Sequence, residues 1–206
     1  MVQRIRIRYA KRGPLRFTSH RDFARAFERA VRRAGIPVAF SQGFTPHPKI
    51  SYASAAPTGV ASEAEYLEIG LQAVVDPADL RDALDAALSP GLDVIEAVQA
   101  SGGSSLADRI DASRWRIELP EIQPSALAEA VAAFVAADEV LVERMTKQGR
   151  RRFDARSAVV RIEVAYPVMT PVAAGGLCSF TGSPHAAVGR PAWGAASSGG
   201  NYTVPG

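Results

Sequence analysis

The first strand expected in this chain has two chemically different faces, and this strongly restricts how the N-terminal part can fold. Residues 4–9 read Arg-Ile-Arg-Ile-Arg-Tyr, which places Ile5, Ile7 and Tyr9 on one side and three arginines on the other. Such strict alternation is typical of a half-buried strand. Its arginine face would enlarge a basic surface if it meets solvent.

The period of the apolar residues then changes from that of a strand to that of a helix. Ser19 followed by Asp22 three residues later resembles a capping box. Phe23 and Phe27 begin an apolar stripe at helical spacing, and Gly35 is a typical stop signal. We therefore expect a helix to follow the strand directly.

The next residues extend this pattern into an α+β unit. Short apolar runs predict strands, and Pro77 at the first turn of a periodic stretch predicts a second helix. The order β-α-β-β-(β)-α-β is that of a ferredoxin-like β-α-β-β-α-β unit with one extra strand. The expected strands are 4–9, 37–41, 50–54, 65–71 and 92–98, and the expected helices are 20–34 and 77–88.

After a Gly/Ser-rich break, a similar order begins again. Strands at 115–119, 139–144 and 153–166 and a helix at 124–137 would open a second ferredoxin-like unit. From residue 173 the chain is mostly Gly, Ala, Ser and Pro, which provides too little apolar surface for folding. We expect a basic ferredoxin-like domain at 1–100, a linker at 101–112, an incomplete second unit at 113–170, and a low-complexity tail at 171–206 that is disordered or aberrant.

Basic and acidic residues are unevenly distributed along the chain. The first fifty residues carry twelve Lys and Arg and two acids, whereas the next fifty carry nine acids and one Arg. Since the formal net charge is only +3, this separation favours a surface that faces a polyanion. Arg21, Arg25 and Arg32 fall within about 40° of one another on the expected helix. Glu63 and Glu65 are expected to be internal ion-pair partners.

Two further segments could contact a nucleic acid. The segment 42–49 is either a binding loop, in which Phe44 stacks on a base and Lys49 meets a phosphate, or a proline-braced turn with Phe44 in the core. A second basic cluster surrounds Gly149 at an expected β-hairpin tip, where it would suit insertion into a groove or merely keep the tip soluble. Its members are Arg144, Lys147, Arg150, Arg151, Arg152 and Arg156.

His20 and His47 are the only histidines before the low-complexity segment. Either imidazole beside Lys and Arg could act as a general base on a phosphodiester. His20 at a helix start would feel the positive end of the dipole, which favours the neutral base. The alternative is structural, with His20 in the first helical turn and His47 as a hydrogen-bonding loop residue.

Composition excludes several classes of site. Cys178 is the only cysteine, so an intramolecular disulfide and a cysteine-based zinc or iron–sulfur site are excluded. No apolar run reaches the ~18 residues of a membrane span. The N-terminus has no apolar signal region, so we expect a cytoplasmic protein without membrane contact.

Three motifs carry a resemblance to a known family. They are Lys-Arg-Gly-Pro-Leu-Arg-Phe-Thr-Ser-His-Arg-Asp at 11–22, Gln-Gly-Phe-Thr-Pro-His-Pro-Lys at 42–49 and Gly-Val-Ala-Ser-Glu-Ala-Glu-Tyr at 59–66. Over about residues 3–168 the chain resembles the radical-SAM-linked proteins, which occur alone or as a C-terminal domain on radical SAM enzymes with cobalamin-binding segments. The resemblance implies a radical SAM enzyme as partner and an RNA context, with no cofactor in this chain. An iron–sulfur cluster, S-adenosylmethionine and cobalamin would belong to the partner.

We therefore expect a non-catalytic RNA-binding or docking module associated with a radical SAM enzyme, in RNA modification. The alternative is a metal-independent endoribonuclease that resembles the CRISPR repeat-processing enzymes, with His20 or His47 as base. A third possibility is a structural domain whose basic face docks an acidic protein. The expected nucleic-acid-binding residues are Lys11, Arg12, Arg16, Arg21, Arg25, Arg32, Gln42, Gly43, Phe44, Lys49, Arg150, Arg151 and Arg152.

Overall fold

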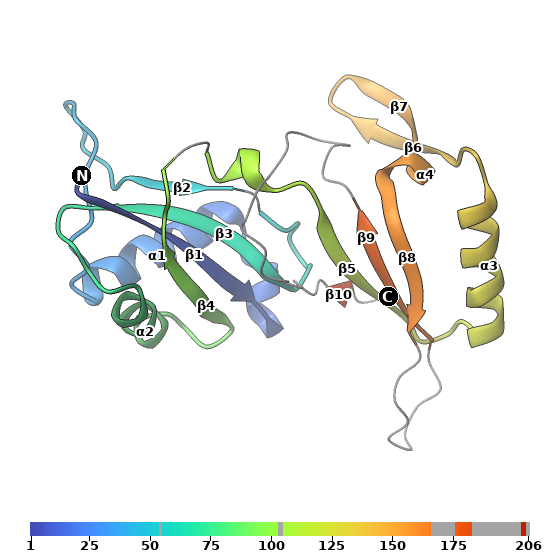
Figure 1. The fold of residues 1–206 in the computed structure, drawn as a ribbon, viewed down its shortest axis with the longest axis horizontal. Helices are drawn as coiled ribbons and strands as arrows, with labels where there is room; N and C mark the ends of the chain where they lie inside the picture. The colour runs from blue at the N-terminus through green and yellow to red at the C-terminus, as the bar shows by residue number, and fades with distance from the viewer. Residues whose placement is uncertain (54, 103–104, 166–175, 183–202, 205–206) are drawn as a thin grey trace, which may run out of the picture. The chain divides into compact units, whose positions relative to one another are not determined.

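The computed structural model describes residues 1–53, 55–102, 105–165, 176–182 and 203–204 (Figure 1). These residues form two compact units, Met1–Arg109 and a second unit that begins at Ile110. Each unit combines helices with a mainly antiparallel sheet, so the predicted α+β class is confirmed. No helix within the described ranges is long and apolar enough to cross a membrane.

The first unit is a ferredoxin-like fold, as predicted. Its strands are ordered β2-β3-β1-β4, and each strand is antiparallel to its neighbours. A short 3-10 segment, η1 (Gly13–Phe17), connects β1 to α1. The elements are β1 (Gln3–Lys11), α1 (His20–Arg33), β2 (Ile50–Tyr52), β3 (Ser62–Leu71), α2 (Pro77–Ala87) and β4 (Leu92–Gln99).

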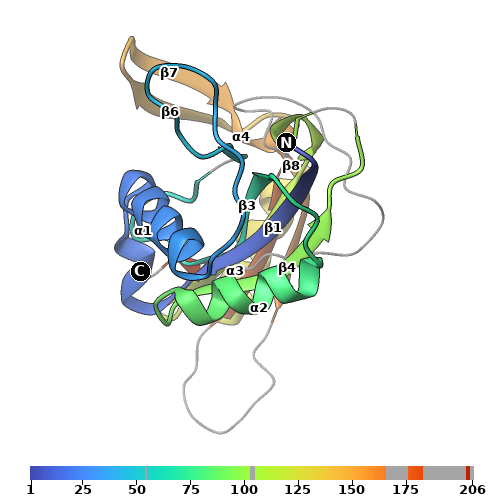
Figure 2. The ribbon, with the colours of Figure 1, turned by 90° about the vertical axis from the view of Figure 1, so that its left-hand side faces the viewer.

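Both helices of this unit pack on one face of the sheet (Figure 2). Ile5 and Ile7 of β1 are fully buried beneath them, and the Tyr9 ring stacks on Phe23 of α1 with 4.2 Å between ring centroids. Each large apolar side chain buried in this way contributes about 1.5–3 kcal/mol. The apolar residues that alternate along β1 and those at helical spacing on α1 therefore form the two sides of one core.

Both ends of α1 follow the predicted signals. The Ser19 hydroxyl accepts a hydrogen bond from the Asp22 backbone N–H at 3.2 Å, which caps the first turn. Gly35 follows the helix with a φ of 65°, a conformation that favours glycine. Residues close to its two ends therefore determine where α1 begins and ends.

The extra strand expected at 37–41 is not formed as a continuous strand. Only isolated bridges occur, from Val38 to Leu71 and from Phe40 to Pro48. Proline cannot donate to a ladder, so Pro48 limits pairing here. The segment between α1 and β2 instead forms a loop held to the edge of the sheet.

The second unit repeats the strand order of the first with one insertion. Its sheet is ordered β10-β5-β9-β8, so β8 and β9 take the places of β2 and β3. Within the described residues, β6 and β7 pair only with each other and form a hairpin between α3 and β8. The bounds are β5 (Ser113–Leu119), α3 (Pro124–Ala136), β6 (Leu141–Thr146), β7 (Gly149–Asp154), α4 (Ala155–Ala158), β8 (Val159–Ala165), β9 (Gly176–Gly182) and β10 (Thr203–Val204).

The prediction of one strand at 153–166 is wrong. The Asp154 carboxylate accepts hydrogen bonds from the backbone N–H groups of Arg156 and Ser157, at 2.9 Å each. This cap starts the helical turn α4, which separates β7 from β8. The strand expected at 139–144 corresponds to β6 of the inserted hairpin. The range 153–166 covers the end of β7, then α4, and then β8, which is the second strand of the four-stranded sheet in chain order.

Strand β9 lies inside the range 171–206 that the composition predicted to be a tail. Its backbone pairs with β5 on one side and β8 on the other. Pairing on both sides provides hydrogen-bond partners for the backbone N–H and C=O groups of β9. The prediction of a tail considered only side-chain composition and not this backbone pairing. At residues 176–182 the structure therefore differs from the expected tail. The rest of that range, apart from β10, lies outside the described residues.

Candidate nucleic-acid interface

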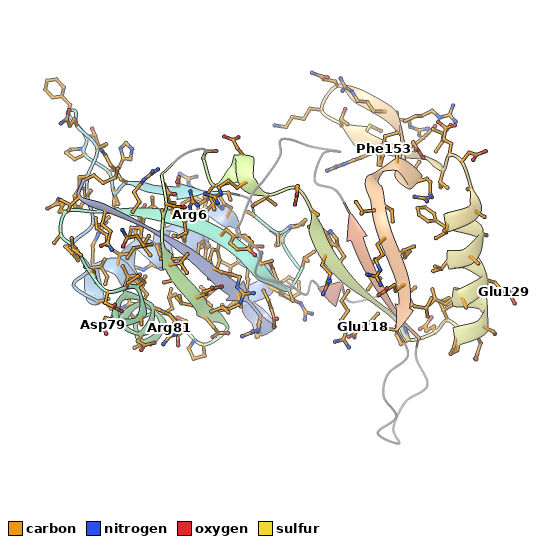
Figure 3. All side chains as sticks on the ribbon, viewed as in Figure 1. Arg6, Asp79, Arg81, Glu118, Glu129 and Phe153 are labelled. Carbon is orange, nitrogen blue, oxygen red and sulfur yellow. The ribbon has the colours of Figure 1, made fainter. Side chains whose placement is uncertain are left out.

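Acidic residues pair with every arginine on the polar face of β1. Arg4 and Arg6 both bind the Glu68 carboxylate of β3, at 3.1 and 3.0 Å. Arg8 lies 3.5 Å from Glu96 of β4. Arg6, which is labelled in Figure 3, is only 3% exposed. Because two carboxylates pair with the three arginines, this row adds little to a solvent-facing basic surface.

Lys11, one of the expected binding residues, is buried. It is 5% exposed, and its ammonium donates a hydrogen bond to the Ala56 carbonyl at 3.2 Å. Burial lowers the pKa of Lys11, and the negative charge of the buried Glu65 partly offsets this effect. Glu65 also accepts a hydrogen bond from the Ala56 N–H at 3.1 Å. Lys11 is therefore a structural cation in this conformation.

Arg12 is engaged by two carboxylates. Its guanidinium nitrogens lie 2.7 Å from Glu63 and 2.7 Å from Asp93. The hydrogen bond to Glu63 is the main cause that raises the pKa of Arg12. The predicted internal pairing of Glu63 is confirmed, and the acidic second quarter of the chain largely neutralises the strand β1 and its extension.

The outer face of α1 keeps its basic side chains available. Arg21, Arg25 and Arg29 are exposed, and no acidic side chain in the described part of the chain pairs with them. Arg32 lies 3.7 Å from Glu28 one turn away, an exposed pair of the kind that contributes little. This face therefore carries a concentration of positive charge without acidic partners among the described residues.

Arg16 joins the first motif to the loop before β3. Its guanidinium carbon lies 4.8 Å from the centre of the Phe17 ring, which is a cation–π contact. Its carbonyl accepts a hydrogen bond from the Gly59 N–H at 2.9 Å. The motifs at 11–22 and 59–66 are therefore packed together, with the Phe17 ring exposed beside Arg16.

The loop at 42–49 is closed at its base and projects from the first unit (Figure 1). The Ser41 N–H donates to the His47 carbonyl at 2.9 Å, and the Ser41 Oγ lies 2.9 Å from His47 Nδ1. The hydrogen-bonding loop role of His47 is thus confirmed. Phe44 is fully exposed, so the alternative that places it in the core is wrong. The exposed loop residues include Gln42, Gly43, Phe44 and Lys49.

Sequence reasoning missed Tyr52. Its ring lies edge-on to His20, at 4.9 Å between centroids, and at 6.0 Å from Phe23. The hydroxyl is buried without a hydrogen-bond partner among the described residues, and burial raises the pKa of Tyr52. His20 itself is the exposed first residue of α1, as its structural alternative predicted. No local signal links β2 to the start of α1, because only tertiary packing brings them together.

The second basic cluster lies on the β6–β7 hairpin as predicted, except for Arg156, which lies in α4. Thr146 pairs with Gly149 at the tip, and Arg150, Arg151 and Arg152 follow it on β7 with exposed side chains. Within the described ranges, no three His, Cys, Asp or Glu side chains come together in a group that could hold a metal ion. The site candidates are therefore basic and aromatic groups.

The chain was compared with known proteins and with models of protein families. No curated protein matches the chain. The family match extends beyond the motifs quoted above and reaches into β9, past the point where the low-complexity tail was expected to begin. Residues 4–181 match the family described as an uncharacterized protein conserved in bacteria (DUF2344), and the chain belongs to that family.

Proposed function

We propose that this chain is a non-catalytic RNA-binding or docking module that works with a radical SAM enzyme in RNA modification. The observation that carries the RNA-binding part is the outer face of α1. There Arg21, Arg25 and Arg29 are exposed without acidic partners among the described residues, whereas each arginine of β1 is paired with a carboxylate. Unneutralised charge of one sign costs self-repulsion unless an anion binds it.

The loop at 42–49 supplies a second kind of contact. A fully exposed phenyl ring gains nothing in water, but it can stack on any base of a single strand. The hydrogen bonds between Ser41 and His47 restrict the loop, which lowers the entropy cost of binding. Charge on the helix and stacking on Phe44 together suit single-stranded RNA better than a folded acidic protein.

The partner in this proposal is a radical SAM enzyme, because the motifs at 11–22, 42–49 and 59–66 resemble those of radical-SAM-linked proteins. The chain would bring RNA to that enzyme. The iron–sulfur cluster, S-adenosylmethionine and cobalamin would all be held by the partner, and the chain would need no cofactor of its own.

The test is a double charge reversal on α1. We expect Arg21→Glu with Arg25→Glu to weaken binding of a labelled oligouridine by more than about tenfold at low salt. The slope of log K against log salt should fall by about 1.4, since each phosphate contact on a single strand contributes about 0.7. Both side chains are exposed, so the melting temperature should hardly change.

The matched control is Arg81→Glu with Arg114→Glu, which changes the net charge equally at two positions outside this face. This control should bind nearly as well as the unchanged protein. Equal weakening in both double variants would mean that only total charge matters. Affinity that is insensitive to salt would contradict the proposal directly.

The competing proposal is a metal-independent endoribonuclease. In its favour, His20 and His47 are both exposed in the unit that carries the free arginines. We expect the same RNA to remain intact when incubated with the protein and a chelator. Cleavage that His47→Ala or His20→Ala abolishes would establish the endoribonuclease instead.

A further inference from the structure

The β6–β7 hairpin has two faces of different electrostatic character. The antiparallel register places Arg144 directly opposite Arg151, and Glu143 directly opposite Arg152. Side chains alternate across a strand, so these two pairs lie on opposite faces. One face carries Val142, Arg144, Thr146, Gly149, Arg151 and Phe153, and the other carries Leu141, Glu143, Met145, Arg150, Arg152 and Asp154.

The face with Arg144 and Arg151 contains no acidic residue, and these two arginines lie directly opposite each other. Like charges opposite each other in an antiparallel pair destabilise it. On the other face, Glu143 lies opposite Arg152 and 3.8 Å from Arg150, so the charges there are partly balanced. An anion bound at this face would offset the repulsion between the two positive charges.

Local hydrogen bonds hold this hairpin in shape. At the tip, the Thr146 hydroxyl donates to the Gly149 carbonyl at 2.8 Å, and Gly149 has a φ of 103°. Arg151 donates to the Gln148 side chain, which orients its guanidinium toward the turn. At the base, the Asp154 carboxylate accepts a hydrogen bond from the Val140 N–H at 2.8 Å. A braced arm can present two guanidinium groups at little entropic cost.

We propose that the hairpin face formed by Arg144, Arg151 and Phe153 binds the phosphate backbone of an RNA strand. This inference rests on the proposed function and adds a second contact site in the inserted arm of the other unit. Each guanidinium can meet phosphate oxygens through two parallel hydrogen bonds. The register places Phe153, which is labelled in Figure 3, on the same face of the hairpin. Its ring is 38% exposed and can stack on a neighbouring base.

The test compares two double variants of the full chain that remove equal charge from the same hairpin. Arg144→Ala with Arg151→Ala should weaken oligouridine binding about tenfold at low salt and lower the salt slope by about 1.4. Arg150→Ala with Arg152→Ala should have less than half of either effect, because Glu143 already offsets those charges. The first double variant removes a like-charge pair and one exposed hydrogen bond to Gln148, so its melting temperature should stay close to that of the unchanged protein.

Equal weakening by both double variants would overturn the assignment to one face. Weakening that appears equally with poly-glutamate as the probe would overturn the choice of RNA in favour of an acidic protein. If the α1 reversal abolishes binding while both hairpin variants bind normally, the hairpin inference fails and the proposed function stands. If only the variant with Arg144→Ala and Arg151→Ala loses binding, the hairpin inference stands and the α1 interface fails.

Discussion

Lys11 and Arg12 are neighbours in the chain, yet the protein satisfies their charges differently. Lys11 is withdrawn from water beside the buried Glu65, whereas Arg12 stays exposed between two carboxylates. An exposed pair contributes little to stability, but a buried charge that loses its counter-charge is costly. Lys11 and Arg12 therefore have different environments, although they are adjacent in a basic motif.

We expect Lys11→Ala to lower the free energy of unfolding by about 3 kcal/mol, because it leaves Glu65 buried without a nearby cation. RNA affinity should not change, since Lys11 is not at the surface. Chemical denaturation and an oligouridine titration check the two parts. Lys11→Met with Glu65→Gln should recover part of the loss, because Gln can still accept from the Ala56 N–H. A loss of RNA affinity in a stably folded Lys11→Ala variant would show that the ammonium reaches the ligand.

At the level of elements, α1 and the β6–β7 hairpin depend on different supports. The inner face of α1 is fixed by a buried core that includes Phe23 and Phe27, so its outer face can change without unfolding. The hairpin has no such core. Most of its side chains are exposed on both strands, and only Val142, Thr146 and Asp154 are half-buried. Hydrogen bonds at the tip and base take the place of apolar packing.

This difference gives the hairpin a specific pH dependence. The backbone hydrogen bond from Val140 lowers the pKa of Asp154 below its ordinary value. A carboxylate whose pKa is lowered on folding stabilises the folded form above its unfolded value of ~3.9, and that contribution is lost as pH falls through the folded pKa.

The base of the hairpin should therefore loosen in acid before the core of the first unit does. Cross-strand NMR contacts of β6 and β7 as a function of pH would measure this. Asp154→Asn should flatten the pH dependence, whereas Glu143→Gln, which removes an exposed charge nearby, should retain it. A hairpin that loosens in step with the whole protein in both variants would rule out this role for Asp154.

The two units of the molecule have the same strand order, but they obtain their strands from different kinds of sequence. The first unit obtains all four strands from residues before 100. Its buried core draws on β1, α1, β3, α2 and β4, and partly buried residues of η1 and β2 pack against it. The sheet of the second unit needs β9, which enters between β5 and β8 from a segment of low-complexity composition. The two units should consequently respond differently to truncation.

We expect a chain that ends at Arg109 to unfold cooperatively, with a melting temperature close to that of the first unit in the full chain. A chain that ends at Pro171 should retain this transition but lose amide protection in β5 and β8, because both strands pair with β9. Calorimetry and hydrogen exchange measure the two results. Normal protection of β5 in the shorter chain would show that β9 is not needed for the second sheet.

Sequence alone determined the local elements whose signals are carried by neighbouring residues. Alternation of Ile5 and Ile7 predicted β1, the Ser19 cap and Gly35 bounded α1, and the order of these elements predicted the ferredoxin-like fold. The hairpin tip around Gly149 was also predictable, because turn chemistry is local.

Only the tertiary structure decided which charges are available. Arg6 and Arg21 look alike in the sequence, but Glu68 is brought to the first by strand pairing across more than sixty positions, and no described acid reaches the second. The contact between His20 and Tyr52 and the central place of β9 are decided in the same way. The physical reason is that ion pairing, burial and sheet order depend on residues distant in the chain, whereas periodicity, caps and turns depend on adjacent ones.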